Sequence, residues 1–350
     1  IRPRVLAFMM AAERKLYKLG IPVKTRHNEV APAQYEIAPI FEATNVATDH
    51  NMLVMETLRT TAEEHGLVCL LHEKPFAGVN GSGKHNNWSM CDSDGNNLLD
   101  PGDTPHENAQ FLVFLCAVLR AIHMYSKVLR IAIAGAGNDH RLGANEAPPA
   151  ILSIFLGEQL TEVVENIIAG KNHTARKGRH ITVGVTALPP LPRDATDRNR
   201  TSPFAFTGNK FEFRAVGSSQ SVAPANIAIN TAVAAAIDDL ANEIEAMLGK
   251  GSSLIDAVQT VLKKYLTEHE AIIFNGDNYS AEWPIEAERR GLPNLKNTVD
   301  ALSTFTSDEI VLLFERCKVL SAREVHSRAE ILFENYSKTL SIEAQITASI

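Results

Sequence analysis

Residues 74 to 89 constrain the fold more than any other segment, because they place a small-residue loop between two strand-like stretches. Residues 80 to 83 read Asn-Gly-Ser-Gly, and His85 follows on the second stretch. The two glycines let the backbone approach a charged ligand and leave amide groups free to meet anionic oxygens. A histidine two residues after this loop could bind a metal that bridges those oxygens. The residues alone leave two interpretations open, an anion-binding loop and an ordinary turn.

Helical and strand-like segments alternate in the first part of the chain. Residues 5 to 19 carry a helical pattern that a Gly-Ile-Pro sequence ends, and residues 45 to 64 carry a second one with Gly66 placed as its cap. The strand-like stretches are residues 27 to 41 and 67 to 76. The pattern therefore predicts strands that flank a helix.

Helical patterns dominate the remaining chain. We expect apolar helices at residues 106 to 131 and 149 to 168, and a long one-faced helix from residue 223 that glycines close near residue 250. Residues 180 to 185 alternate as a strand before a proline-rich loop. Everything after about residue 252 is amphipathic and predicts a helical region for packing and assembly.

Residues 211 to 214 read Phe-Glu-Phe-Arg, a clean alternation typical of a half-buried strand. The two phenylalanines should face a core, so Glu212 and Arg214 should share the opposite face. If that face lines a cavity, one strand presents a metal ligand and an anion clamp together.

Composition excludes several classes of partner. The chain has 350 residues, 45% of them hydrophobic, and a net charge of -7 with no long Lys/Arg block, which argues against nucleic acid or a membrane surface. The longest apolar run, residues 111 to 119, is too short to span a bilayer. Cysteines 69, 91, 116 and 317 lack CxxC spacing and indicate free thiols in a reducing, cytoplasmic compartment.

Four motifs in the same order resemble those of glutamine synthetases. Residues 74 to 89 resemble the ATP-binding signature, and residues 26 to 37 resemble a metal-binding strand with two glutamates. Residues 140 to 148 resemble the substrate loop, and residues 197 to 202 with 209 to 214 resemble the phosphate-binding and final metal strand. The sequence is most similar to that of the type III enzymes, and the similarity extends from about residue 10 to the end of the chain.

The resemblance implies an α+β fold of the glutamine synthetase/guanido kinase-like class, with a curved antiparallel half-barrel sheet backed by helices. Residues 1–251 would form the catalytic domain and residues 252–350 the helical C-terminal region of type III enzymes. The family also carries an upstream Glu-x-Glu metal pair and an N-terminal β-domain, which have no counterpart before Glu29. The chain begins with Ile1 in mid-pattern, so we expect a longer parent protein and an inactive fragment.

The same resemblance implies two metal sites, for Mg²⁺ or Mn²⁺. Glu29 and Glu36 would hold the metal near glutamate, whereas His85 and Glu212 would hold the metal that orients the nucleotide phosphates. Glu29 and Glu36 are seven residues apart, so an uninterrupted strand would place them on opposite faces. Pro32 between them predicts a kink that could bring both to one side.

Substrate roles follow in the same way. Asn80 and Gly81 would contact the bound glutamate, and Arg141 would bind its carboxylate through a bidentate guanidinium. Glu146 would close the site and help to take a proton from ammonium.

Nucleotide and phosphate roles complete the assignment. Ser82, Gly83 and Lys210 would contact ATP. Arg200 and Arg214 would stabilise the phosphoryl group during transfer, where arginine contributes most to the transition state.

The resemblance implies ATP-dependent ligation of ammonia to the γ-carboxylate of L-glutamate, by a homo-oligomer that would form a ring. Two alternatives stay open. A γ-glutamyl amine ligase of the same superfamily would have a bulkier acceptor pocket near Glu146. A non-catalytic assembly or regulatory paralogue would have lost metal ligands or arginines, yet all those expected in this span are present.

Overall fold

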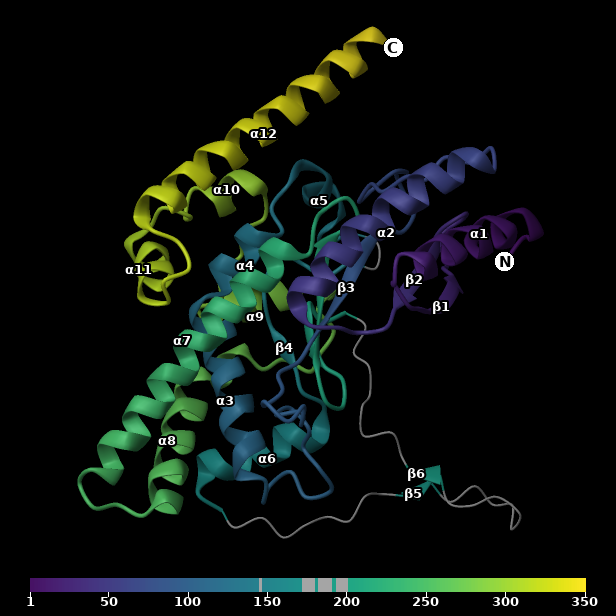
Figure 1. The fold of residues 1–350 in the computed structure, drawn as a ribbon. Helices are drawn as coiled ribbons and strands as arrows, with labels where there is room; N and C mark the ends of the chain where they lie inside the picture. The colour runs from purple at the N-terminus through teal and green to yellow at the C-terminus, as the bar shows by residue number, and fades with distance from the viewer. Residues whose placement is uncertain (145–146, 172–179, 182–190, 193–200) are drawn as a thin grey trace.

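The computed structural model describes residues 1–144, 147–171 and 201–350, together with the short backbone strands β5 (His180–Ile181) and β6 (Leu191–Pro192). The α+β class is confirmed: short strands lie among twelve α-helices in the described part of the chain (Figure 1). Most of the strand predicted at residues 180 to 185, and most of the proline-rich loop after it, lie outside the described residues.

The first helices and strands form a small unit on one side of the molecule (Figure 1). Its own apolar cluster, formed by Leu16, Ile21, Val23 and Val54, holds two helices against a hairpin. Residues 27 to 41, expected as one strand-like stretch with a kink at Pro32, belong to two strands of a hairpin, because Pro32 and a left-handed Ala33 (φ 57°) turn the chain back on itself. The elements are α1 (Pro3–Lys18), β1 (Val23–Asn28), β2 (Tyr35–Pro39) and α2 (Thr44–Glu64).

Residues 67 to 76 form no strand, contrary to the prediction. Only part of this segment is buried, and its side chains alternate in exposure without a neighbouring strand to pair with. Glu73 is the one residue of the segment that is fully buried. The helix before it ends as predicted, with Gly66 in the left-handed conformation (φ 60°) just beyond the last turn.

The main sheet has four strands in the order β3-β8-β7-β4. The first three are antiparallel, as the resemblance implies, and the short β4 pairs parallel with β7 at the end of the sheet. A parallel neighbour needs a long crossover, and α6 (Glu158–Ala169) lies in that connection. The strands are β3 (Gly83–Trp88), β4 (Ile154–Phe155), β7 (Phe204–Phe206) and β8 (Phe211–Gly217).

The expected helix at residues 149 to 168 begins late. Residues 151 to 156 are buried throughout and run through β4, and the helix starts only after Gly157, whose φ of 79° breaks the strand. The local pattern was misleading, because a short apolar run that is buried on both faces has no period.

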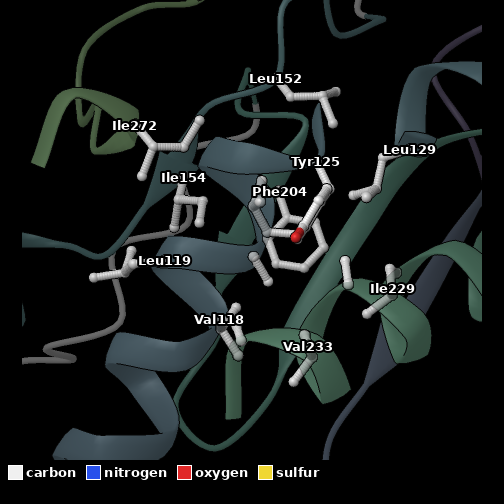
Figure 2. Packing of buried hydrophobic residues seen from close by; sticks show 14 of the residues in the cluster. Val118, Leu119, Tyr125, Leu129, Leu152, Ile154, Phe204, Ile229, Val233 and Ile272 are labelled. Carbon is white, nitrogen blue, oxygen red and sulfur yellow. The ribbon is translucent and has the colours of Figure 1, made fainter. Parts of the chain in front are cut away.

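The apolar helix predicted at residues 106 to 131 is two helices, α3 (Ala109–Met124) and α4 (Ser126–Ala132), with a 73° bend at Tyr125. The break has neither proline nor glycine, so packing sets it: Tyr125 turns its ring into the core beside Phe204 (Figure 2). No single helix in the described ranges is long and apolar enough to cross a membrane. The bent pair of α3 and α4 together meets the length and composition expected of a span, and by those two criteria alone.

One large core joins the sheet to nearly all the helices. Phe204, Phe211 and Phe213 are fully buried on one face of the sheet, and Figure 2 shows Phe204 among residues of α3 and α7 (Ala223–Leu248). Full burial of a phenylalanine side chain stabilises a fold by about 1.5–3 kcal/mol. The predicted direction of Phe211 and Phe213 is confirmed.

The chain after residue 252 is helical, as predicted, and packs on the same core. Its last helix begins at a capping box between Ser321 and Glu324, and its fully buried residues, Val325 and Ala329, lie in its first half (Figure 1). The elements are α8 (Leu254–His269), η1 (Glu270–Ile272), α9 (Trp283–Arg289), α10 (Thr298–Leu302), α11 (Asp308–Arg316) and α12 (Ala322–Ser349).

Candidate active site

The polar face of the sheet is built by β3 and β8, which pair antiparallel. Asn87 lies opposite Glu212, but the register then shifts, so that two residues of β8, Arg214 and Ala215, lie across from His85. Such a bulge turns the strand and re-aims its side chains. The result is one face that carries imidazole, carboxylate and guanidinium groups within a few ångströms, above a core of phenylalanines.

Glu212 lies at the centre of this face and is only 5% exposed. Its Oε1 lies 3.2 Å from Nδ1 of His85, and its Oε2 accepts from Nη2 and Nε of Arg214 at 2.7 and 2.9 Å. Burial alone would raise the pKa of Glu212, but the hydrogen bond from His85 and the charge of Arg214 outweigh it and lower the pKa to about 2. The carboxylate is therefore ionised at any physiological pH.

His85 has the chemistry of a metal ligand. When Nδ1 donates to Glu212, Nε2 of the neutral ring keeps its lone pair, and the side chain is half exposed. A carboxylate and an imidazole fit a divalent cation such as Mg²⁺ or Mn²⁺. Glu212 and Arg214 share a face, and His85 joins them, as the sequence predicted.

The loop at residues 80 to 83 lies directly over Arg141, the last residue of α5 (Ala136–Arg141). A Cβ on Gly81 would lie 2.9 Å from Cγ of Arg141, and a Cβ on Gly83 would lie 2.0 Å from its Nη2. The loop needs glycine because the arginine occupies the space of a side chain. Asn80 is half-buried beside them.

Arg141 itself is 5% exposed, and its guanidinium donates to the carbonyl oxygens of Arg214 (3.0 Å) and Val216 (3.4 Å) and to Oδ1 of Asn138 (3.2 Å). Burial lowers its pKa to about 10, which still leaves it fully charged. The structure thus brings Arg141, Gly81 and the strand of Arg214 together.

The two glutamates of the predicted first metal site lie on the β1–β2 hairpin. Glu29 follows β1 and is half-buried, whereas Glu36 is exposed on β2 opposite His27. The hairpin touches the loop through Gln34, whose Nε2 donates to the carbonyl of Gly81 at 2.8 Å. Nowhere in the described ranges do three His, Cys, Asp or Glu side chains gather as a metal site. Glu29 and Glu36 are therefore near the loop, but not assembled with His85 and Glu212.

Of the remaining predicted residues, the structure describes Lys210 and Ser82 but not Glu146 and Arg200. Lys210 is half-buried immediately before β8, and its carbonyl accepts from the amide of Thr207 at 2.8 Å. The amide of Ser82 donates to the carbonyl of Glu73 at 2.8 Å. Glu146 and Arg200 lie outside the described residues, so the structure says nothing of their positions.

Two charged residues at this site escaped the sequence analysis. Glu73 is 3% exposed, and its Oε1 accepts from the amide (2.9 Å) and the hydroxyl (2.6 Å) of Ser219. Lys84 donates from Nζ to the carbonyls of Ser218 (2.8 Å) and Gln220, and burial lowers its pKa to about 8. The signal for Glu73 was a lone acidic residue at the end of an apolar stretch, which a surface position explains equally well.

Comparison with known families identifies the class of protein. The family model "Glutamine synthetase, catalytic domain" matches residues 5–133, and "Glutamine synthetase C-terminal domain" matches residues 257–350. Two structures, described as apo GmaS without ligand and as a GmaS/ADP complex, share the fold at TM-scores of 0.59 and 0.57 with 17% identity, over 97% and 98% of this chain and 61% and 64% of theirs. The chain belongs to the glutamine synthetase family.

Curated relatives narrow the resemblance to the type III branch. The chain is 52% identical to the type-3 glutamine synthetase of Dictyostelium discoideum, over 97% of this chain and 46% of the relative. It is 50% identical to the glutamine synthetase of Butyrivibrio fibrisolvens, over 98% and 49%, and 47% identical to that of Bacteroides fragilis, over 100% and 48%. The chain therefore spans about half the length of the curated relatives it matches.

Proposed function

We propose that the protein catalyses ATP-dependent synthesis of glutamine from L-glutamate and ammonia. ATP would phosphorylate the γ-carboxylate of glutamate, and ammonia would then displace phosphate from the acyl phosphate. The observation that carries the proposal is Glu212, a buried and permanently ionised carboxylate between His85 and Arg214 on the face beside the 80–83 loop. Relatives at about 50% identity that are named glutamine synthetase support it.

In this proposal the site neutralises two anions that must meet. His85 and Glu212 hold a divalent cation, which supplies Lewis-acid stabilisation of the phosphate oxygens when bound. Arg214 is held in place by Glu212 and presents its charge to the transferring phosphoryl group, together with Arg200. Glu29 and Glu36 serve the second cation, next to glutamate.

Substrate recognition falls to the loop and to α5. Asn80, Gly81 and Arg141 bind glutamate, since the structure brings the loop and the guanidinium into contact. Ser82, Gly83 and Lys210 contact ATP.

Glu146 closes the site and accepts a proton from ammonium. A carboxylate within hydrogen-bond reach of the proton can act as a general base.

The larger organisation belongs to the same proposal. Residues 1–251 act as the catalytic domain and residues 252–350 as the helical C-terminal region of a homo-oligomer, which we propose to be a ring. All four cysteines are free thiols, which supports a cytoplasmic location.

The test is a γ-glutamyl hydroxamate and phosphate-release assay on the complete protein, extended to the full length of its relatives. We expect turnover with ammonia, its loss when EDTA removes divalent cations, and a decrease of about 100-fold in Glu212→Gln. The matched control is Glu288→Gln, which changes an exposed glutamate on α9. Turnover only with small organic amines would identify an amine ligase, and no turnover with either acceptor would favour a non-catalytic paralogue.

A further inference from the structure

Two charged residues next to the 80–83 loop, the buried Glu73 and the half-buried Lys84, have no part in the chemistry above. Glu73 lies in the irregular segment before the loop, and Lys84 lies in β3 directly after it. We propose that Glu73 is a positioning residue, which holds three chain segments of the glutamate pocket in register, with Lys84 fixing one of them. The inference rests on the proposed function, because it assigns the pocket to glutamate.

Glu73 holds the loop and the end of β8 at the same time. Its main-chain oxygen accepts from the amide of Ser82 at 2.8 Å, and its carboxylate accepts from the amide and hydroxyl of Ser219 at 2.9 and 2.6 Å. Hydrogen bonds to an ionised carboxylate are about twice as strong as neutral ones. One residue therefore links residues 80–83 to residues 217–219, which are more than 130 positions apart in sequence.

Two glycines, Gly217 and Gly137, leave the space that the Glu73 carboxylate occupies. A Cβ on Gly217 would lie 2.3 Å from Oε1 of Glu73, and a Cβ on Gly137 would lie 2.3 Å from Oε2. Neither glycine has a left-handed φ, so close approach and not backbone conformation is what excludes a side chain there. The contact with Gly137 adds a third segment, α5, which ends at Arg141.

Lys84, on β3, binds the residues that follow β8, next to Ser219. Its Nζ donates to the carbonyls of Ser218 and Gln220, and its buried charge lies near that of Glu73. A half-buried cation and a buried anion that both bind one turn stabilise it as a set, because removal of the cation leaves the buried carboxylate uncompensated.

Each segment that Glu73 holds contributes a group to the proposed pocket. The loop contributes Gly81, α5 contributes Arg141, and Arg141 in turn donates to the backbone of β8 at Arg214 and Val216. Loss of the Glu73 carboxylate would let these segments shift without any change in a group that touches substrate. Partners of this kind alter affinity or activity by roughly 10–100-fold in binding sites.

The kinetic test compares Glu73→Ala and Glu73→Gln with the control Glu63→Gln, an exposed glutamate on α2, all in the complete protein. We expect Glu73→Ala to raise KM for glutamate about 10-fold or more and to leave KM for ATP within about twofold. Glu73→Gln should be intermediate, because its amide oxygen can still accept from Ser219. An equal change in both KM values, or none, would overturn the assignment.

A second variant covers the case in which Glu73→Ala fails to fold. Ser219→Ala removes only the hydroxyl donor, so it should raise KM for glutamate in the same direction by a smaller factor. Its effect should be smaller in the Glu73→Gln background than in the wild type if both act through one contact, because the neutral amide accepts from Ser219 more weakly than the carboxylate does. Full additivity would show that the two residues act independently, contrary to the proposal.

Hydrogen exchange separates this inference from the proposed function. In Glu73→Ala the amide of Ser219 and the amides of residues 80–83 should exchange faster than in the wild type, whatever reaction the protein catalyses. If the wild type shows no turnover, the proposed function fails and exchange alone decides the role of Glu73. Unchanged exchange in both segments would refute it.

Discussion

Acidification should weaken the packing of α8 against α3 through two histidines in contact, the buried His269 and the half-buried His123. Nδ1 of His123 lies 3.0 Å from Nδ1 of His269, and Nη1 of Arg120 lies 2.8 Å from Nε2 of His269. A guanidinium can only donate, so Nε2 of His269 must be the acceptor. The proton of His269 is then on Nδ1 and is donated to His123. This geometry leaves no place for a second proton on His269.

Other charged groups lie around the pair. Asp239 of α7 accepts from Arg120 at 2.8 Å, Arg316 of α11 pairs with Asp239, and the ring of Tyr265 lies under Arg120. Asp239 is therefore already neutralised by two arginines. It offers little compensation to a protonated histidine. Oε2 of Glu268 lies 3.9 Å from Nε2 of His269, but the Glu268 side chain is 47% exposed, so solvent screens it.

The magnitude follows from proton linkage. Burial above all, and then His123 and Arg120, lower the pKa of His269 to about 4, whereas an unfolded histidine titrates at about 6.5. The unfolded chain then binds more protons, so stability falls as the pH drops below about 6.5 and levels off below about 4. Between pH 7 and pH 5 the loss is about 2 kcal/mol. His269 is 7% exposed, so solvent screens this effect weakly.

The assay is thermal unfolding at pH 7 and pH 5. For 350 residues, 2 kcal/mol corresponds to about 3 °C in Tm. We expect the decrease in Tm between the two pH values to be about 3 °C smaller in His269→Gln than in the wild type. The control His326→Gln changes an exposed histidine of α12 and should keep the wild-type decrease. A decrease in His269→Gln equal to that of the wild type would refute the reasoning.

Two further substitutions test the core and the loop. Phe213→Ala should cost about 3–5 kcal/mol and lower Tm by about 4–7 °C, because the side chain is fully buried, whereas Phe41→Ala, at a site 91% exposed, should be nearly neutral in the same thermal scan. Gly83→Ala should raise KM for glutamate about 10-fold or more, since the new Cβ displaces Arg141. Gly249→Ala, whose Cβ meets nothing closer than 3.5 Å, is its control, and equal KM values for both variants would contradict this account of the loop.

Periodic segments were predicted well from sequence because their apolar residues recur on one face. The helix from residue 223 was confirmed, and so was the placement of Phe211 and Phe213 on the core face, opposite Glu212 and Arg214. The errors fall where both faces are apolar or where the chain turns. Residues 151 to 156 have no period because both faces are buried, and the bend at Tyr125 has no local signal because packing alone decides it.

The candidate site shows the same division. Motif order in the sequence predicted His85, Glu212, Arg214 and the glycines of the loop as site residues, since each is a residue type that the proposed chemistry requires. Sequence reasoning could not find Glu73, because an isolated glutamate beside an apolar stretch has no pattern that distinguishes a buried anchor from a surface residue.

The sequence by itself determined the family, the α+β class, and the residue types available for binding anions and cations, because these depend on local pattern and on the order of motifs. Only the tertiary structure decided which of those residues meet. The bulge opposite His85 aims three side chains at one point, and the space left by Gly81 and Gly83 admits Arg141. Contacts between segments more than 50 residues apart depend on packing, which no local pattern encodes.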